Sequence, residues 1–208
     1  GGVNVSGMSN DIGMSFNNPA LLKPSMHSQM NAVFNSFYGG IKVYHLSLGY
    51  RNEKLNTNFS WGLNYFGYGN TPQTDASGNE LGNFRPVDWV MQLSASRKYL
   101  EKWNYGLTIK IINSNYGQFR SSGIAADLGL LFHDTVNLFS ASIVAKNMGT
   151  QLKRYNGTTA DDLPFDLQIG FTKRLAKAPL AFSLTAQRIH RFDILYNDTL
   201  FNNENGFE

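Results

Sequence analysis

Apolar and polar side chains alternate with a period of two along most of this chain. In residues 103–113, Trp103, Leu107 and Ile109 share one parity, whereas Thr108 and Lys110 fall on the other. Successive side chains of a strand point to opposite faces, so this segment predicts a strand with one apolar and one polar face. Its length of about ten residues exceeds the usual five or six, and it matches the roughly 9–11 that a tilted strand needs to cross a bilayer.

The same alternation recurs along the chain and predicts about nine strands. They cover residues 29–38, 42–51, 57–68, 88–99, 103–113, 122–133, 136–147, 164–175 and 180–189. Short connections near 52–56, 100–102, 134–135 and 176–179 alternate with longer ones at 69–87, 116–121 and 148–163. This rhythm is typical of an antiparallel up-and-down barrel with one plain rim and one elaborate rim.

With about nine strands, the predicted sheet cannot close into a barrel. Bacterial barrels have an even number of strands, and residues 197–205 fade into polar sequence without a closing strand. We therefore interpret residues 28–208 as the first nine or so strands of a longer all-β transmembrane barrel, with long loops at 69–87 and 148–163.

Residues 1–27 do not alternate. Pro19 and Pro24 cannot donate to a strand ladder, whereas Met14, Phe16 and other apolar residues of this segment favour burial. A compact plug packed inside the barrel satisfies both observations. An ordinary N-terminal arm with one helical turn is the alternative that the spacing leaves open.

Composition changes this picture only in part. Charged residues are 16% of the 208, below the roughly 25% typical of soluble domains, while apolar residues are 42%. Few charges and many small neutral polar residues suit a barrel wall, but a secreted β domain has the same composition. A net charge of +3 without any basic run argues against nucleic acid as a partner, and the absence of cysteine excludes disulfides and thiolate chemistry.

Several charged residues within the strands need water rather than lipid. A lysine or arginine at mid-depth on the lipid side costs roughly 2–4 kcal/mol. We therefore predict that such residues face the barrel lumen, where they would line a transport path or pair with the plug. They are Arg97, Lys110, Asp127, Lys146, Asp166 and Lys173.

Catalytic and metal-binding patterns are missing from the sequence. The four histidines form no HExxH or His-x-His spacing, and no G-x-S-x-G signature is present. We predict neither an enzyme nor a cofactor or metal site.

Longer motifs give the chain a family resemblance. Asn18-Pro19-Ala20 resembles the plug box of FadL-type outer-membrane barrels. The stretches 16–22, 65–69, 114–117, 127–130, 147–149 and 163–168, together with Lys173-Arg-Leu and Ala178-Pro179, resemble the PorQ family of the type IX secretion system, in the PorV/PorQ branch of FadL-like barrels.

The resemblance implies a 14-stranded barrel in the outer membrane of a Bacteroidetes-type bacterium. It also implies a non-enzymatic role beside PorV, PorU and PorZ in the complex that attaches secreted cargo to the cell surface. Two other hypotheses stay open: a FadL-like channel for hydrophobic small molecules, and a soluble ligand-binding β-barrel.

Overall fold

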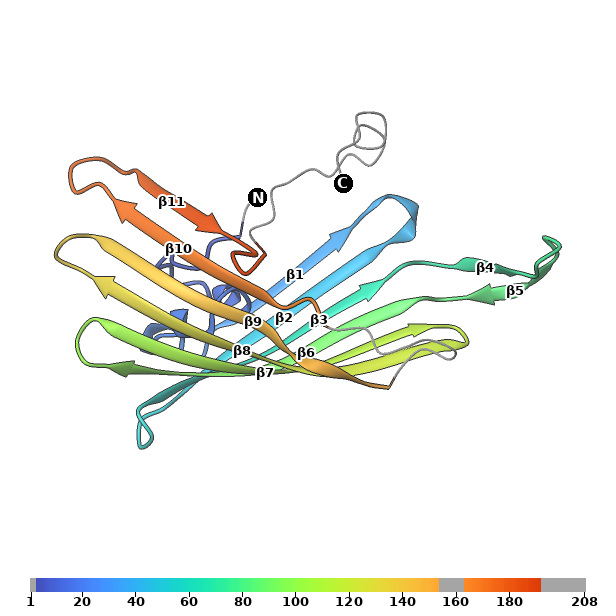
Figure 1. Cartoon of the computed structure of the whole chain (residues 1–208), viewed down its shortest axis with the longest axis horizontal. Coiled ribbons are helices and arrows are strands. Elements are labelled where there is room, and N and C mark those ends of the chain that lie inside the picture. The colour runs from blue at the N-terminus through green and yellow to red at the C-terminus, as the bar shows by residue number, and fades with distance from the viewer. Residues whose placement is uncertain (1–2, 154–162, 192–208) are drawn as a thin grey trace, which may run out of the picture.

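The computed structural model describes residues 3–153 and 163–191 (Figure 1). Its main sheet has nine strands in the order β1-β2-β3-β6-β7-β8-β9-β10-β11, and all of its pairings are antiparallel. This confirms the all-β, up-and-down arrangement predicted from the alternation. The strands are β1 (Met30–Ser36), β2 (Lys42–Asn52), β3 (Thr57–Gly67), β6 (Val87–Tyr99), β7 (Trp103–Tyr116), β8 (Phe119–Asp134), β9 (Phe139–Lys153), β10 (Asp166–Arg174) and β11 (Ala181–Ala186).

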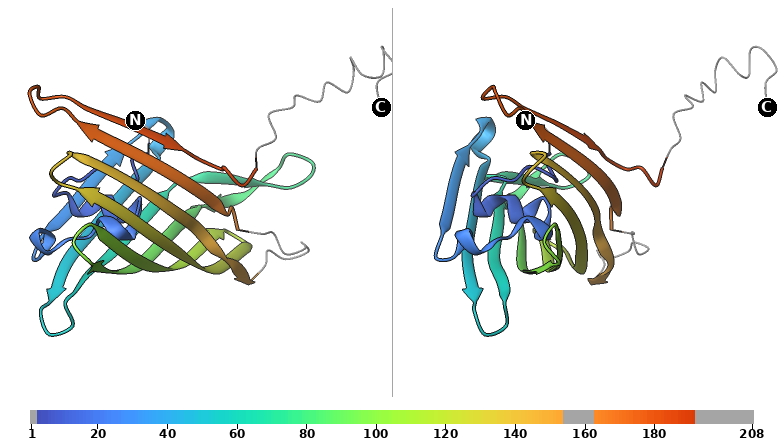
Figure 2. Two further views of the ribbon diagram at one scale, coloured as in Figure 1. Left: turned by 60° about the vertical axis from the view of Figure 1, so that its left-hand side comes forward. Right: turned by 90° about the vertical axis from the view of Figure 1, so that its left-hand side faces the viewer.

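The sheet is strongly curved, with a convex outer face and a concave inner face (Figure 2). Within residues 3–153 and 163–191, β1 pairs only with β2 and β11 only with β10. The two edge strands therefore do not meet, and the described part of the chain is an open curved sheet.

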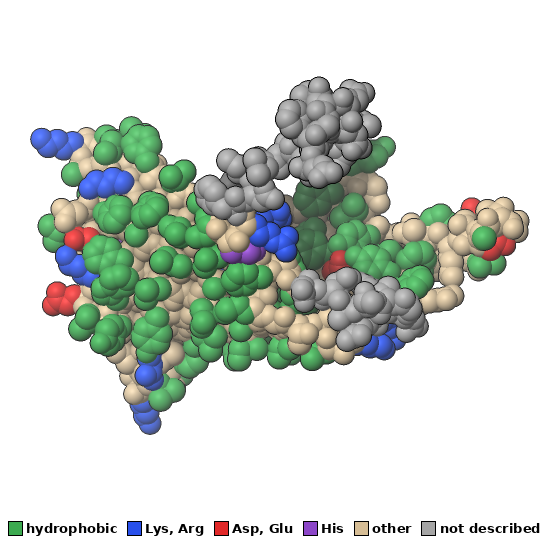
Figure 3. All heavy atoms as spheres, viewed as in Figure 1, with side chains coloured by type: hydrophobic (Ala, Val, Ile, Leu, Met, Phe, Trp, Pro, Cys, Tyr) green, Lys and Arg blue, Asp and Glu red, His purple; other side chains and the backbone are tan. Residues whose placement is uncertain are grey.

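Apolar side chains occupy the convex face. Leu107, Leu128 and Phe171 are 42%, 51% and 46% exposed. Lys110 and Asp127, on the opposite parity, are only 8% and 2% exposed. Figure 3 shows hydrophobic side chains spread over the outer surface of β8, β9 and β10. The sheet therefore presents its apolar side chains outward and its polar ones inward, the reverse of a soluble domain with an apolar centre.

The N-terminal segment lies inside the curve of the sheet, over the part of the concave face towards the short turns (Figure 2, blue). This segment contains three short 3-10 helices, η1 (Ile12–Phe16), η2 (Pro19–Leu21) and η3 (Pro24–Met26), and a fourth, η4 (Tyr38–Gly40), follows β1. Two small apolar clusters hold the segment together and against the sheet: Ile12 with Leu22 and Met26, and Ala20 with Leu21 and Leu131. None of the helices that the structure describes is long and apolar enough to span a membrane.

Three predicted connections differ from the structure. Residues 69–87 contain a hairpin, β4 (Thr71–Thr74) with β5 (Glu80–Phe84), which forms a separate two-stranded sheet. Residues 116–121 are not a long connection, because β7 and β8 pair up to Tyr116 and Phe119 across a tight turn. In the predicted loop 148–163, β9 continues to Lys153, and residues 154–162 lie outside the described residues.

Candidate functional site

Asn18 anchors the N-terminal segment at the start of η2. The side chain is fully buried; its Oδ1 accepts a hydrogen bond from the Ala20 backbone N–H (2.9 Å), and its Nδ2 donates to the Val5 carbonyl (2.8 Å). An asparagine in this position caps a helix start, and Pro19 follows it in the first turn, where the missing N–H costs no hydrogen bond. The Asn18-Pro19-Ala20 motif therefore links two parts of the N-terminal segment.

Glycines on the inner face of the sheet make room for this motif. A Cβ built on Gly106 of β7 would lie 2.5 Å from the Pro19 carbonyl carbon, and one built on Gly129 of β8 would collide with Asn18 Oδ1. Real Cβ atoms do not come so close to backbone atoms. The two adjacent glycines, paired in register, form a flat seat on which η2 lies directly against the strands.

A second set of contacts fixes residues 5 and 6 to β9. Ser140 Oγ donates to the Ser6 carbonyl (2.7 Å), and Ser142 Oγ donates to the Val5 carbonyl (2.8 Å). Ser6 Oγ also hydrogen-bonds Thr172 Oγ1 of β10 at 2.8 Å. Small hydroxyl side chains of neighbouring strands thus satisfy the backbone of a segment that forms no ladder of its own.

Two of the predicted charged residues, Lys110 and Asp127, meet on the concave face. Lys110 Nζ and Asp127 Oδ2 are 2.6 Å apart, and Asp127 Oδ1 accepts a hydrogen bond from the Asn147 backbone N–H (2.8 Å). Here the pairing of β8 with β9 shifts register, and Asn147 has a φ of 57°. Such a bulge places an extra residue opposite one on the partner strand. In this sheet it brings a backbone donor to a buried carboxylate.

Lys146 and Asp166 lie on the same inner face, opposite each other in the pairing of β9 with β10. Lys146 Nζ donates to the Phe16 carbonyl (3.1 Å) and so contacts the N-terminal segment. Asp166 accepts from Gln168 Nε2 and from the Arg188 backbone N–H, both at 2.6 Å. Four of the six predicted residues therefore face inward, and one of them contacts the N-terminal segment directly.

For Arg97 and Lys173 the predicted inward orientation is wrong. Arg97 pairs with Tyr105 on the outward parity and donates from Nε to Thr57 Oγ1 (2.6 Å). Lys173 shares the outward parity of Phe171 and donates to the Asn137 carbonyl at 2.6 Å. Both lie near the short-turn ends of their strands, where a long side chain reaches polar groups at the rim, so the cost of a charge at mid-depth does not apply.

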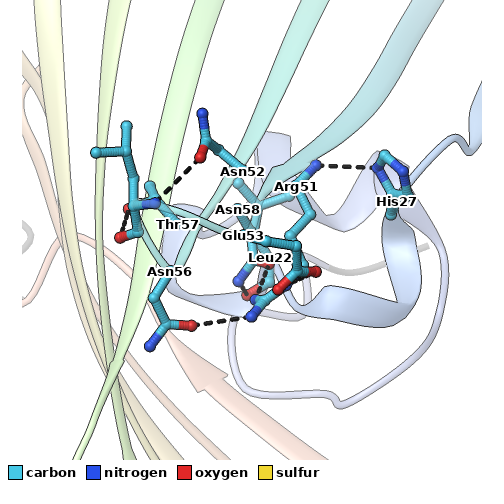
Figure 4. Close-up of polar contacts among 9 residues, drawn as sticks. Leu22, His27, Arg51, Asn52, Glu53, Asn56, Thr57 and Asn58 are labelled. Carbon is cyan, nitrogen blue, oxygen red and sulfur yellow. Dashed lines mark hydrogen bonds and ion pairs between the residues drawn. The ribbon is translucent and has the colours of Figure 1, made fainter.

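A polar cluster at the β2–β3 turn, centred on Arg51, fixes η3 to the rim (Figure 4). The Arg51 guanidinium bonds Glu53 at 2.7 Å, Asn58 at 3.0 Å and Asn56 at 2.9 Å, and the Arg51 backbone N–H donates to His27 Nδ1. The hydrogen bond from Arg51 lowers the pKa of the Glu53 carboxyl. Sequence reasoning missed this cluster, since it treated residues 52–56 only as a short polar turn.

The arrangement holds the N-terminal segment against the sheet and buries charged side chains. Throughout the described residues, no group of three His, Asp or Glu side chains is placed to hold a metal ion. Comparisons of the sequence with family models and with curated proteins find no match. The inference of function therefore depends on the geometry of this concave face and on the motif resemblance.

Proposed function

We propose that this chain is part of a FadL-like β-barrel of the bacterial outer membrane, with the convex apolar face in contact with lipid. Outward side chains that are 42–51% exposed, such as Leu107, Leu128 and Phe171, would lose contact with water in that setting. In this proposal the free edges of β1 and β11 pair with further strands of a closed, 14-stranded barrel.

Within the membrane we propose a non-enzymatic scaffold role in the type IX secretion system, beside PorZ, PorU and PorV. The observation that carries it is the occupied concave face, where Asn18 and the Gly106–Gly129 seat hold the N-terminal segment in place of an open passage. At the opposite end from this segment, the β4–β5 hairpin projects beyond the main sheet (Figure 1). A filled interior and a projecting hairpin favour binding of a protein partner at the rim over transport through the centre.

Purification from native outer membranes tests this role. An affinity-tagged protein, extracted in mild detergent, should bring down PorZ, PorU or PorV. Replacing residues 72–83 by a short Gly-Ser linker should release them, because the hairpin would be lost while β3 and β6 stay paired. The matched control replaces residues 176–178, in the exposed short turn before β11 at the other rim, and should retain the partners. Recovery of the barrel protein alone, with both loops intact, contradicts the scaffold role.

The alternative function is a FadL-like channel for hydrophobic small molecules. It is favoured by a pocket of about 530 Å³ beside the N-terminal segment, with Met8, Met14 and Phe139 in its wall. Uptake of a fatty acid or an aromatic compound by proteoliposomes would support this function. Absence of uptake, together with partner recovery in the purification, would favour the scaffold.

A further inference from the structure

The charged side chains that line the pocket beside the N-terminal segment are all basic. It lies between that segment and strands β8–β11 at the short-turn end of the sheet, and Lys23, His133 and Arg174 are in its wall. No aspartate or glutamate lines it. A pocket of about 530 Å³ has the size of a small-molecule site, which typically measures roughly 300–1,000 Å³.

A second pocket adjoins the first and extends the positive region. It measures about 370 Å³ and shares Lys23 and His133 with the first pocket, while adding Lys98, Arg51 and Lys102. Glu101 is its single acidic lining residue. Two of these cations are already neutralised, since Arg51 pairs with Glu53 and Lys102 pairs with Asp134.

In the part of the chain that the structure describes, the remaining cations have no acidic partner. Among residues 3–153 and 163–191, Lys23, Lys98 and Arg174 form no salt bridge. The pKa of Lys23 is lowered, first by its partial burial and then by the charge of Arg174. Both causes disfavour the ammonium form, and an anion placed between the two side chains would favour it and so oppose both effects.

Hydroxyl and apolar groups complete the wall. Thr172 and Ser183 are linked at 2.9 Å and stand on the same side as Arg174, while Met8 and Met14 come from the N-terminal segment. Hydroxyls supply further hydrogen bonds to an oxyanion, and an arginine offers a planar fork that matches phosphate oxygens. The methionines provide a surface for an apolar group attached to the anion.

We propose that the first pocket, of about 530 Å³, binds the phosphate group of an organic phosphate, held between Lys23 and Arg174. A phosphate monoester carries about −1.5 to −2 charges at neutral pH, which two cations can neutralise. Its source is either the headgroup of a membrane lipid or a soluble phosphate. The site is independent of the partner-binding hairpin, which projects from the other end of the sheet (Figure 1).

Isothermal titration of the protein in a non-ionic detergent tests the site. The probes are inorganic phosphate and dihexanoyl phosphatidic acid, with dihexanoyl phosphatidylcholine as a zwitterionic control. Lys23→Gln and Arg174→Gln should each weaken binding of the anionic probe by about tenfold, because each removes a charge-assisted hydrogen bond. Lys177→Gln, at an exposed position in the turn before β11, should leave binding unchanged.

The two probes distinguish the source of the phosphate. Binding of both probes means that the phosphate group suffices. Binding of phosphatidic acid alone means that the lipid chains contribute and the bilayer is the source. Either result supports the proposal when both glutamine variants lose affinity. Absence of binding to both probes overturns it, as does equal affinity of the unaltered protein and both variants. Heat-dependent mobility on gels checks that each variant is folded.

Discussion

Lys110 of β7 and Asp127 of β8 form an ion pair of 2.6 Å on the concave face of the sheet, where both are almost inaccessible to water. They are not opposite each other in the ladder: Lys110 pairs with Ala125, and Asp127 pairs with Thr108. The contact is therefore diagonal, and it is reinforced by the Asn147 backbone N–H. Burial of either charge alone would be strongly unfavourable, so each side chain stays ionised in this position because the opposite charge is beside it.

Removing both partners of this pair should destabilise the protein by less than the sum of the two single losses. Lys110→Met leaves the buried Asp127 carboxylate without its salt-bridge partner, which should lower the free energy of unfolding by about 3–5 kcal/mol. In the double variant Lys110→Met/Asp127→Leu, both charges of the pair are removed together, so its loss should be well below the sum of the two single losses. Denaturant unfolding in detergent measures the loss for Lys110→Met, for Asp127→Leu and for the double variant. Lys54→Met in the exposed β2–β3 turn should stay within about 0.5 kcal/mol, and additive losses for the pair would contradict the prediction.

The glycine seat under η2 should be intolerant of a methyl group. Gly129→Ala forces a Cβ against Asn18 Oδ1, which should cost about 1–3 kcal/mol and loosen the N-terminal segment. Chymotrypsin cleavage after Phe16, which is followed by Asn17, reports this loosening and should become faster. Gly67→Ala on β3 meets its nearest atom at an ordinary 3.4 Å and should leave cleavage unchanged. Equal cleavage rates for the two variants would mean that η2 does not depend on the seat.

The bulge residue Asn147 should respond differently to two substitutions. Its φ of 57° suits glycine but strains a β-branched side chain. Asn147→Val should therefore be less stable than Asn147→Gly by about 1–2 kcal/mol, although both lose the side-chain contacts to Lys110 and to the Pro164 carbonyl. Denaturant midpoints of the two variants provide the comparison. A valine variant as stable as the glycine variant would argue against the left-handed backbone.

The stability of the β4–β5 hairpin turn should depend on pH through the ionisation of Asp75. The pKa of this carboxyl is lowered, first by the hydrogen bond from the Asn79 side chain and then by backbone N–H groups. Because the folded pKa lies below the unfolded one, the carboxylate stabilises the turn above the ordinary aspartate pKa, and this is lost as pH falls through the lowered value. In an NMR titration, Asn79→Ala should raise the pKa of Asp75, whereas Asn83→Ala should not change it.

The sequence predicts the strands better than the segments between them. A period of two is a strong signal wherever one face is apolar, and strands such as β2 and β3 begin at the predicted residue. The alternation does not predict the β4–β5 hairpin, because Pro72 and Gly82 interrupt it in the two short strands.

The candidate site was predicted only in part, because parity and contact are different kinds of information. Parity correctly places Lys110 and Asp127 on one face, but their diagonal contact depends on the register between β7 and β8 and on the bulge at Asn147, which alternation does not encode. Arg97 and Lys173 were predicted to share the inward parity of the other four residues, although each follows the outward parity of its own strand. Both residues lie near the short-turn end of their strand, where an outward-facing charge can reach polar groups at the rim.

Fluorescence quenching at single cysteines tests most directly whether the convex face contacts lipid. The chain has no cysteine, so Leu107→Cys, Leu128→Cys and Ser77→Cys each give one labelled position in the protein reconstituted into vesicles. We predict that labels at 107 and 128 are quenched by nitroxides on lipid acyl chains and protected from iodide, while the label at 77, in the hairpin turn, shows the opposite. Iodide quenching at 107 and 128 as strong as that at 77 would contradict the membrane assignment.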